Sequence, residues 1–321
     1  MCSSDLGLVA INVDHREAWL FGTNSVEVWY DAGDANFPLA RIQGAYNEIG
    51  CAAPYSVAKL DNSLFWLGAD DRGQGIVYKA NGYTGQRVST HAIEYAIAQY
   101  GNISDAIAYT YQQEGHNFYV LTFPSANATW VYDAATQAWH ERAGFSRGEF
   151  TRHRSNCQCN FQGNILVGDF ENGNVYRFNL DVYADNGEVQ KSLRSWRALP
   201  TGQNNLKRTA QHSLQLDAES GVGLNGFTTE QVFYLTSQSG EKLITQSGDY
   251  IASAIVETTQ SDPKVMLRWS DDGGHNWSNE HWMSMGGIGQ FGTRIIWRRL
   301  GMTTKIRDRV YEVSEIGRAH V

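Results

Sequence analysis

Residues 117–142, NFYVLTFPSANATWVYDAATQAWHER, contain the pattern that decides the fold of this 321-residue chain. An apolar strand is followed by a polar turn and then by Val131, with an aromatic residue directly after it. Three other segments repeat this order: AWLFGTNSVEVWYDAG (18–33), LFWLGADDRGQGIVYKANG (64–82) and NILVGDFENGNVYRFN (164–179). The aligned valines are Val28, Val77, Val131 and Val175, which lie 49, 54 and 44 residues apart. A repeat of this length, with short strands and polar turns, is typical of β-propeller blades of about four strands each.

The repeat predicts where the four valines lie. In a propeller they occupy equivalent inner positions on successive four-stranded sheets around one axis. The alternative is a β-sandwich whose hairpins resemble one another by coincidence, and a single continuous sheet holding all four valines would contradict the propeller. The shared pairs of valine and aromatic residue favour the propeller.

The composition is that of a soluble β-rich protein. Aromatic residues make up 12% of the chain and charged residues only 19%, against about 25% in an average protein. The net charge of −8 gives no support for tight nucleic-acid binding by the chain as a whole. The sequence has neither a run of about 18 apolar residues for a membrane span nor a secretory signal at its start. The four cysteines are too few for a disulfide scaffold and fit a reducing compartment.

The two ends of the chain are related to each other. Residues 316–321 can be encoded by DNA whose reverse complement, started at its GTG codon, encodes residues 1–5. Unrelated protein termini have little reason to show this relation, so both ends are interpreted as translated sequencing adapter. Residues 1–6 and 315–321 are therefore expected to be artefacts that pack against nothing, at the ends of an environmental fragment.

The remaining sequence is expected to divide at about residue 200. Propeller blades are predicted over residues 7–200, followed by a polar linker without aromatic residues at 201–211. Residues 212–314 are predicted to form a smaller β-domain of hairpins. Strands are expected there at 231–235 and 242–245, and residues 226–259 are interpreted as an insertion.

One stretch of the propeller region predicts a helix. In THAIEYAIAQYGN (90–102), apolar residues recur at Ile93, Ile97 and Tyr100. This spacing indicates a short amphipathic helix that ends at Gly101. The helix is expected between the second and third blades, as a packing or partner-facing element.

Residues 270–277, SDDGGHNW, satisfy the Asp-box pattern S-x-D-x-G-x-x-W through Ser270, Asp272, Gly274 and Trp277. We expect Asp272 to accept backbone N–H bonds across the turn, Gly274 to adopt a φ that other residues avoid, and Trp277 to pack beneath. A structural turn is the favoured interpretation. Asp boxes are common in sialidase propellers, which makes a glycosidase the competing hypothesis, but the Arg-Ile-Pro signature of sialidases is absent.

Other residues that could carry chemistry lack the necessary partners. His153, Cys157 and Cys159 form an H-x3-C-x-C set without the second ligand pair of a zinc site. His116 and His140 lie near acids, but no nucleophile motif or phosphate-binding loop accompanies them. No catalytic residue, cofactor or metal site is therefore predicted.

Basic residues crowd the last strands, where the sequence singles out Arg294, Arg298, Arg307 and Arg309. Arg294 and Arg298 are expected to project from one face of their strand, and Arg307 and Arg309 from one face of theirs. Trp297 is expected on the face opposite Arg298 and in the core. The favoured interpretation is a subunit interface, in which acids of a neighbouring subunit pair with these arginines, or a solvated face. Contact with DNA is the alternative.

Several segments resemble one family. LRWSDDGGHNW, with the WRRLG and RDRVYEVS strands that follow, resembles the C-terminal region of the tail-hub, or packaged-DNA stabilisation, proteins of short-tailed phages. HAIEYAIAQY, TWVYDAATQAWHER and GDFENGNVYRFN are similar to earlier parts of the same proteins. The motifs occur in the family's order, and together they cover most of residues 8–313.

The resemblance implies a structural protein of the virion tail, assembled in the cytoplasm of the bacterial host as a homohexameric ring below the portal and its adaptor. Such a ring closes the portal channel, stabilises packaged DNA and supports attachment of tailspikes and of a tail needle or plug. Double-stranded DNA would pass through without sequence-specific binding, and the negative net charge suits a wall that repels phosphates. The alternatives are an Asp-box carbohydrate-active propeller, either a sialidase-like glycosidase or a lectin, and an adhesin-like propeller.

Overall fold

The computed structural model describes residues 7–70, 73–146, 148–180, 182, 184–186, 188–197, 208–221, 228–234, 252–259, 263–303 and 309–316. The chain divides into two compact units, residues 1–181 and 182–321. All sheets in the described residues are antiparallel. No helix in these residues is long and apolar enough to cross a membrane.

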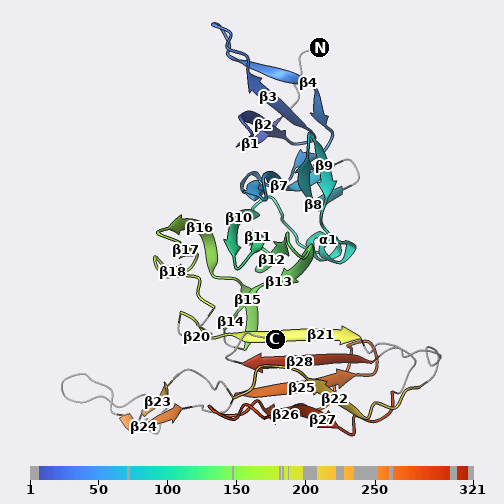
Figure 1. Ribbon diagram of the computed structural model, residues 1–321, viewed down its shortest axis with the longest axis vertical. Helices are drawn as coiled ribbons and strands as arrows, with labels where there is room; N and C mark the ends of the chain where they lie inside the picture. Colours follow the sequence, from blue (N-terminus) through green and yellow to red (C-terminus); the bar gives the residue numbers. More distant parts are fainter. Residues whose placement is uncertain are drawn as a thin grey trace, which may run out of the picture. The chain divides into compact units, whose positions relative to one another are not determined.

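The first unit consists of sheets that follow one another along the chain and are termed blades 1 to 4 (Figure 1). Blade 1 pairs β1 (Leu8–Asp14), β2 (Glu17–Gly22), β3 (Val26–Asp31) and β4 (Leu39–Asn47) in that order. Blade 2 pairs β5 (Gly50–Cys51), β7 (Ser63–Asp70), β8 (Gly73–Asn81) and β9 (Thr84–Arg87), with β6 (Ala58–Leu60) also on β7 and a 3-10 helix, η1 (Pro54–Ser56), before β6. Blade 3 pairs β10 (Ile107–Gln113), β11 (His116–Phe123), β12 (Ala128–Asp133) and β13 (Ala138–Glu141).

Blade 4 has three strands, β16 (Ser155–Phe161), β17 (Asn164–Asp169) and β18 (Val175–Arg177). A hairpin of β14 (Ala143–Ser146) and β15 (Glu149–Arg152) precedes it. The propeller prediction of successive small sheets is confirmed, although the fourth sheet lacks a fourth strand among the described residues.

The same tight turn recurs in every blade. Two consecutive residues with positive φ join β1 to β2, β6 to β7, β10 to β11 and β16 to β17. Such pairs are typical of type I′ hairpin turns, whose twist matches that of the flanking strands. The residue pairs are His15 and Arg16, Asp61 and Asn62, Glu114 and Gly115, and Gln162 and Gly163.

The four aligned valines all lie on the third strand of their blade, in β3, β8, β12 and β18. Val28, Val77 and Val131 are at most 1% exposed, and each packs in a cluster with residues of the following blade. These three valines thus occupy equivalent, buried positions, as the repeat predicts. Val175 does not, because its side chain is 65% exposed.

The register of blade 4 explains why Val175 differs. Val175 pairs with Gly168, whereas Ile165, on the other face of β17, packs against blade 3. Val175 therefore faces away from blade 3, just as Val77 and Val131 face the blade that follows their own. No following blade of the first unit lies among the described residues to cover it.

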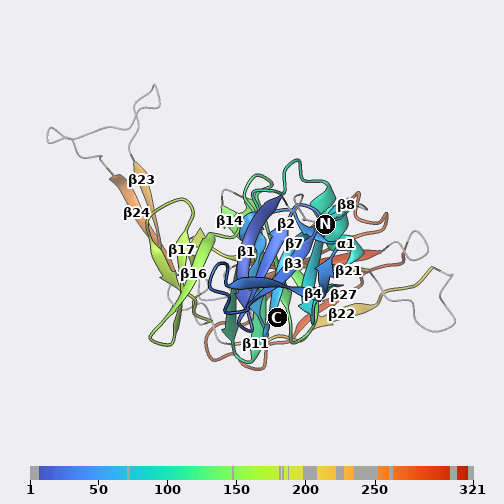
Figure 2. The ribbon, with the colours of Figure 1, turned by 90° about the horizontal axis from the view of Figure 1, so that it is seen from above.

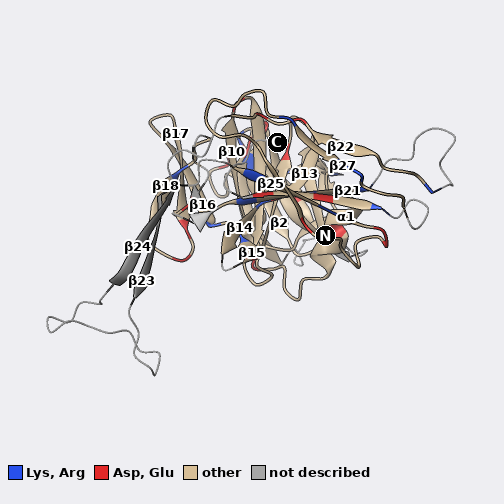
Figure 3. Ribbon diagram, turned by 90° about the horizontal axis from the view of Figure 1, so that it is seen from below, with Lys and Arg blue, Asp and Glu red and all other residues tan. Residues whose placement is uncertain are grey.

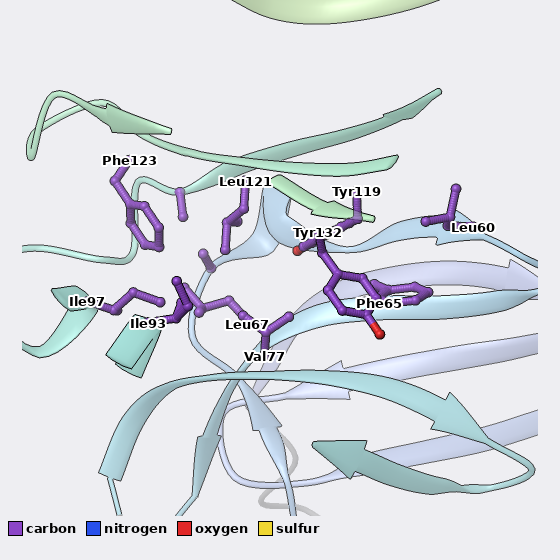
Figure 4. Close-up of a cluster of buried hydrophobic side chains, with 12 residues drawn as sticks. Leu60, Phe65, Leu67, Val77, Ile93, Ile97, Tyr119, Leu121, Phe123 and Tyr132 are labelled. Carbon is purple, nitrogen blue, oxygen red and sulfur yellow. The ribbon is translucent and has the colours of Figure 1, made fainter. Parts of the chain in front are cut away.

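The largest cluster joins blades 2 and 3. Phe65, Leu67 and Val77 of blade 2 point toward Tyr119 and Leu121 of blade 3 (Figure 4). Each of these five side chains is completely buried. A second cluster, around Trp19, Phe21 and Trp66, joins blades 1 and 2.

The predicted helix is present as α1 (His91–Ala98), between β9 and β10. The Thr90 hydroxyl caps it by accepting the Ile93 N–H at 3.5 Å, and Ile93 and Ile97 are buried in the cluster between blades 2 and 3. The helix ends at Ala98, three residues before the Gly101 at which it was expected to end. The Gln99 N–H bonds back to the carbonyl groups of Ala96 and Ile97 there.

The second unit has a four-stranded sheet in the order β21 (Lys191–Arg197), β28 (Val310–Ile316), β25 (Lys264–Ser270) and β26 (His281–Ser284). A separate pair, β22 (Ser213–Leu216) and β27 (Ile295–Arg298), packs on it through a core that includes Leu267, Trp297 and Val313. Within the described residues, two more hairpins pair only with themselves: β19 (Ala184–Asp185) with β20 (Glu188–Val189), and β23 (Thr228–Tyr234) with β24 (Ala252–Thr259). The latter hairpin lies to one side of the other strands of the unit (Figures 1 and 2).

The expected boundaries need correction. The division falls between residues 181 and 182 instead of near 200, because β21 pairs along its whole length with β28. Glu315 and Ile316 are not a loose artefact: they continue β28, and Glu315 is 1% exposed. Ala210, at the end of the expected linker, forms a β-bridge with Met302. The rest of the expected artefacts, residues 1–6 and 317–321, lies outside the described residues, as do 201–207 and the strand expected at 242–245.

Candidate functional site: the Asp-box turn and the arginines of the second unit

The Asp-box residues form one turn directly after β25. The Asn276 N–H donates to Asp272 Oδ1 at 2.8 Å, and the Asn276 side-chain amide donates to Oδ2 at 2.5 Å. The Ser270 hydroxyl donates to Asp272 at 2.7 Å and accepts the Gly274 N–H at 2.9 Å. Gly274 has a φ of +105°, which only glycine adopts without strain.

These contacts favour the ionised form of Asp272. The backbone N–H of Asn276, followed by the Ser270 hydroxyl, lowers the pKa of the Asp272 carboxyl well below its ordinary value. The carboxylate is thus a fixed acceptor within the turn. The geometry agrees with the expected structural use of Asp272 and Gly274.

Trp277 lies beside a charged pair on the adjacent strands. The Arg268 guanidinium stands over its ring at 4.7 Å, a cation–π distance. The same guanidinium donates to Glu312 of β28 at 2.5 Å. Trp277 is partly buried and holds the turn against Arg268.

Arg309 does not belong to an exposed interface, which corrects the prediction made for it. Its side chain is 2% exposed, and its Nε and Nη2 donate to the two carboxylate oxygens of Asp271 at 2.6 and 2.9 Å. Its Nη1 donates to the Leu300 carbonyl at 2.8 Å. Burial alone would lower the pKa of Arg309, but hydrogen bonds to Asp271 raise it above the ordinary value. Charge spacing along the sequence gave no sign of this burial.

The other three predicted arginines are placed differently. Arg294 and Arg298 are exposed, and Trp297 between them is 5% exposed in the core, as expected from strand alternation. Arg307 lies outside the described residues. Figure 3 shows acidic and basic residues interspersed on the strands of this unit.

The residues considered for metal binding belong to the first unit, in blade 4 and the segment before it. Cys157 and Cys159 are exposed on β16, whereas His153 is buried. The His153 Nδ1 is 2.6 Å from the Ser155 hydroxyl and accepts the Ser155 N–H at 3.3 Å. No group of three or more potential ligands is arranged to hold a metal ion in the described part of the chain.

Sequence reasoning missed a pocket between β26 and β27. It has a volume of about 350 Å³, and its lining includes Trp269, Trp282 and Trp297. Tryptophan recurs through residues 269–297, which was the only sequence signal. The register that brings three distant indoles together could not be read from that spacing.

The fold thus defines a β-propeller followed by a β-sandwich, and two family models describe the same pair of domains. The family described as bacteriophage P22 Gp10, beta-propeller, matches residues 3–183, and the one described as bacteriophage P22 Gp10, beta-sandwich, matches residues 241–316. The chain belongs to the bacteriophage P22 Gp10 family. It is a structural protein of the phage tail hub and a component of the virion tail.

Other comparisons add little. No curated protein matches the chain. A crystal structure of a glycoside hydrolase family 43 arabinoxylan arabinofuranohydrolase from Bacillus subtilis, in complex with cellotetraose, is similar over 100% of this chain and 67% of its own. Its identity is 10% and its TM-score 0.23, which is too low to indicate a shared fold or activity.

Proposed function

We propose that this tail hub protein assembles as a homohexameric ring against the portal and its adaptor. The ring closes the portal channel, stabilises the packaged DNA and provides attachment sites for tailspikes and for a needle or plug. It assembles in the cytoplasm of the bacterial host before it becomes part of the virion. The observation that supports this most is the match of both units, in order, to the two Gp10 domains.

The charges of the chain are compatible with such a ring. A net charge of −8 disfavours tight binding to DNA that must pass through the channel. Exposed Arg294 and Arg298 offer positive charge at a surface where a neighbouring subunit or the adaptor can present acids. Exposed ion pairs contribute about 0–1 kcal/mol each and weaken with salt, so they set specificity and salt dependence more than affinity.

The test is sedimentation of the chain with the portal-adaptor complex of the same phage, at low and high salt. We expect a ring-sized complex that the double variant Arg294→Glu with Arg298→Glu weakens, most clearly at low salt. Arg177→Glu, an exposed arginine of blade 4, is the matched control and should leave association unchanged. Absence of any association would overturn the ring proposal, whereas association indifferent to the double variant would remove only the arginine assignment.

A further inference from the structure

The pocket between β26 and β27 has walls that are fixed by contacts within the second unit. The Trp269 ring stacks on His281, with centroids 4.8 Å apart and planes 12° from parallel. The Trp297 indole donates to the His281 carbonyl at 2.9 Å. The Trp282 indole donates to Glu280 at 3.1 Å, while the residue stays 46% exposed.

These hydrogen bonds determine what the tryptophans can offer a ligand. The indole N–H groups of Trp282 and Trp297 already have acceptors, so their remaining capacity is apolar contact through the ring faces. Trp282 is the more accessible of these two tryptophans, because it is 46% exposed and Trp297 only 5%. The pocket therefore presents a preformed aromatic surface, and its rim is open to a ligand at Trp282.

The rim also carries charges of both signs. Glu280, Arg298 and Arg299 line the pocket and are exposed. None of the three forms a salt bridge with another described residue. A carboxylate acceptor and two guanidinium donors thus stand beside the indoles with capacity for further hydrogen bonds.

This combination points to one ligand chemistry. An acidic peptide would meet Glu280, and a basic peptide would meet both arginines, so each would be repelled at part of the rim. Sugar hydroxyls donate and accept hydrogen bonds, and the C–H faces of a pyranose ring are apolar. We propose that the pocket binds a saccharide, with Trp282 contacting the ring face and with Glu280 and Arg299 bonding hydroxyl groups. A volume of about 350 Å³ lies at the lower end of the range for ligand pockets, which suits one or two sugar rings.

This binding site goes beyond the role in the ring and is tested separately from it. The chain is titrated by calorimetry with three uncharged oligosaccharides, maltotetraose, chitotetraose and xylotetraose, and saturation-transfer NMR identifies the sugar protons in contact. Arg298 is left unchanged because it also carries the proposed interface. A peptide rich in aspartate and containing one tryptophan is titrated in parallel.

We expect saturable binding of at least one saccharide. Trp282→Ala should weaken it by at least about tenfold, and Glu280→Gln by at least about threefold. Trp196→Ala is the matched control, because Trp196 is 38% exposed on β21 of the same unit and does not line the pocket; it should change affinity less than twofold. Thermal unfolding of each variant verifies that it is folded.

Three results would overturn the proposal. The first is no saturable binding of any of the three saccharides to the folded chain. The second is binding that Trp282→Ala and Glu280→Gln leave unchanged. The third is binding of the acidic peptide alone, lost in Trp282→Ala, which would assign the pocket to a protein partner.

Discussion

Arg309 reaches Asp271 through two hydrogen bonds of 2.6 and 2.9 Å, and this pair fastens the Asp-box turn to the residue directly before β28. The same guanidinium donates to the carbonyl groups of Leu300 and Met302. One side chain, directly before β28, therefore connects the turn after β25 with the segment after β27. Asp271, which stands at a variable position of the Asp box, thus also anchors the turn.

Loss of the Asp271 carboxylate should be strongly destabilising. Asp271→Ala leaves the Arg309 guanidinium buried without a counter-charge, which typically costs about 3–5 kcal/mol. We expect a loss near the lower end, about 3 kcal/mol, in the free energy of unfolding measured with urea, because Asp271 itself is 22% exposed. The exposed Asp217→Ala should change it by less than about 0.5 kcal/mol.

A double variant separates the charge effect from lost packing. Asp271→Ala combined with Arg309→Met removes the buried charge and should be less destabilised than Asp271→Ala alone. A double variant that is markedly less stable than Asp271→Ala would show that Arg309 acts mainly through its contacts with the Leu300 and Met302 carbonyl groups.

Equivalent valines should respond differently to the same substitution. Val131→Ala removes two buried methyl groups between blades 3 and 4 and should cost about 2 kcal/mol of the free energy of unfolding. Val175→Ala, at the same place in blade 4, should cost less than about 0.5 kcal/mol because Val175 is 65% exposed. Equal costs in urea unfolding of the chain would show that Val175 is covered by a packed element.

The repeat and its strands were predictable because their causes are local. Alternating apolar residues and tight turns define each hairpin within about 20 residues, and the Asp box forms its hydrogen bonds within seven. The repeat did not reveal that Val175 is exposed. Sequence alignment equates it with Val28, Val77 and Val131, but burial depends on whether another sheet follows.

The errors in the second unit come from contacts between distant parts of the chain. The boundary was misplaced because Lys191 pairs with Ile316, a pairing that no local pattern reveals. Arg309 was read as exposed because its neighbours in the sequence are charged, whereas its burial depends on Asp271, 38 residues earlier. The tryptophan pocket was missed because its walls come from three separate segments.

Substitution of Asp272 should reduce the stability of the folded chain without removing a catalytic activity. Asp272→Ala removes the acceptor of two hydrogen bonds from Asn276 and should lower the melting temperature of the chain. Asp217→Ala serves again as the control. An unchanged melting temperature together with loss of a measurable glycan hydrolysis would favour the glycosidase hypothesis instead.

The contribution of the Asp272 carboxylate to the stability of the turn should depend on pH, because the pKa of Asp272 is lowered in the folded chain. An unfolded Asp has the higher pKa, so the stabilisation by Asp272 is present above about pH 4 and is lost as the pH falls below it. The difference in stability between the parent chain and Asp272→Asn should therefore shrink in acid. A difference that stayed constant from pH 6 to pH 3 would contradict this role for the carboxylate.

His153 should make the first unit sensitive to a milder fall in pH. Burial, aided by the charge of Arg142, lowers the pKa of His153 to about 3, so the folded chain holds it neutral. Its Nδ1 accepts from Ser155, whose hydroxyl is 2.5 Å from the hydroxyl of Tyr109. Burial raises the pKa of Tyr109 to about 12, so the phenol keeps its proton and can donate toward Ser155. A protonated His153 could no longer accept the Ser155 N–H, so protonation would remove that hydrogen bond.

The sign of the pH effect follows from the two states. Between about pH 6.5 and pH 3 the unfolded chain binds a proton at His153 and the folded chain does not. The contribution of neutral His153 to the free energy of unfolding is therefore fully present above pH 6.5, and it falls by about 1.4 kcal/mol per pH unit below that value. Between pH 7.5 and pH 5 the parent chain should lose about 2 kcal/mol that the non-titrating variant His153→Gln does not lose. The measurement is urea unfolding of the parent chain and of His153→Gln at both pH values. Equal pH dependence in His153→Gln and the parent chain would show that the site admits water or a proton in the folded state.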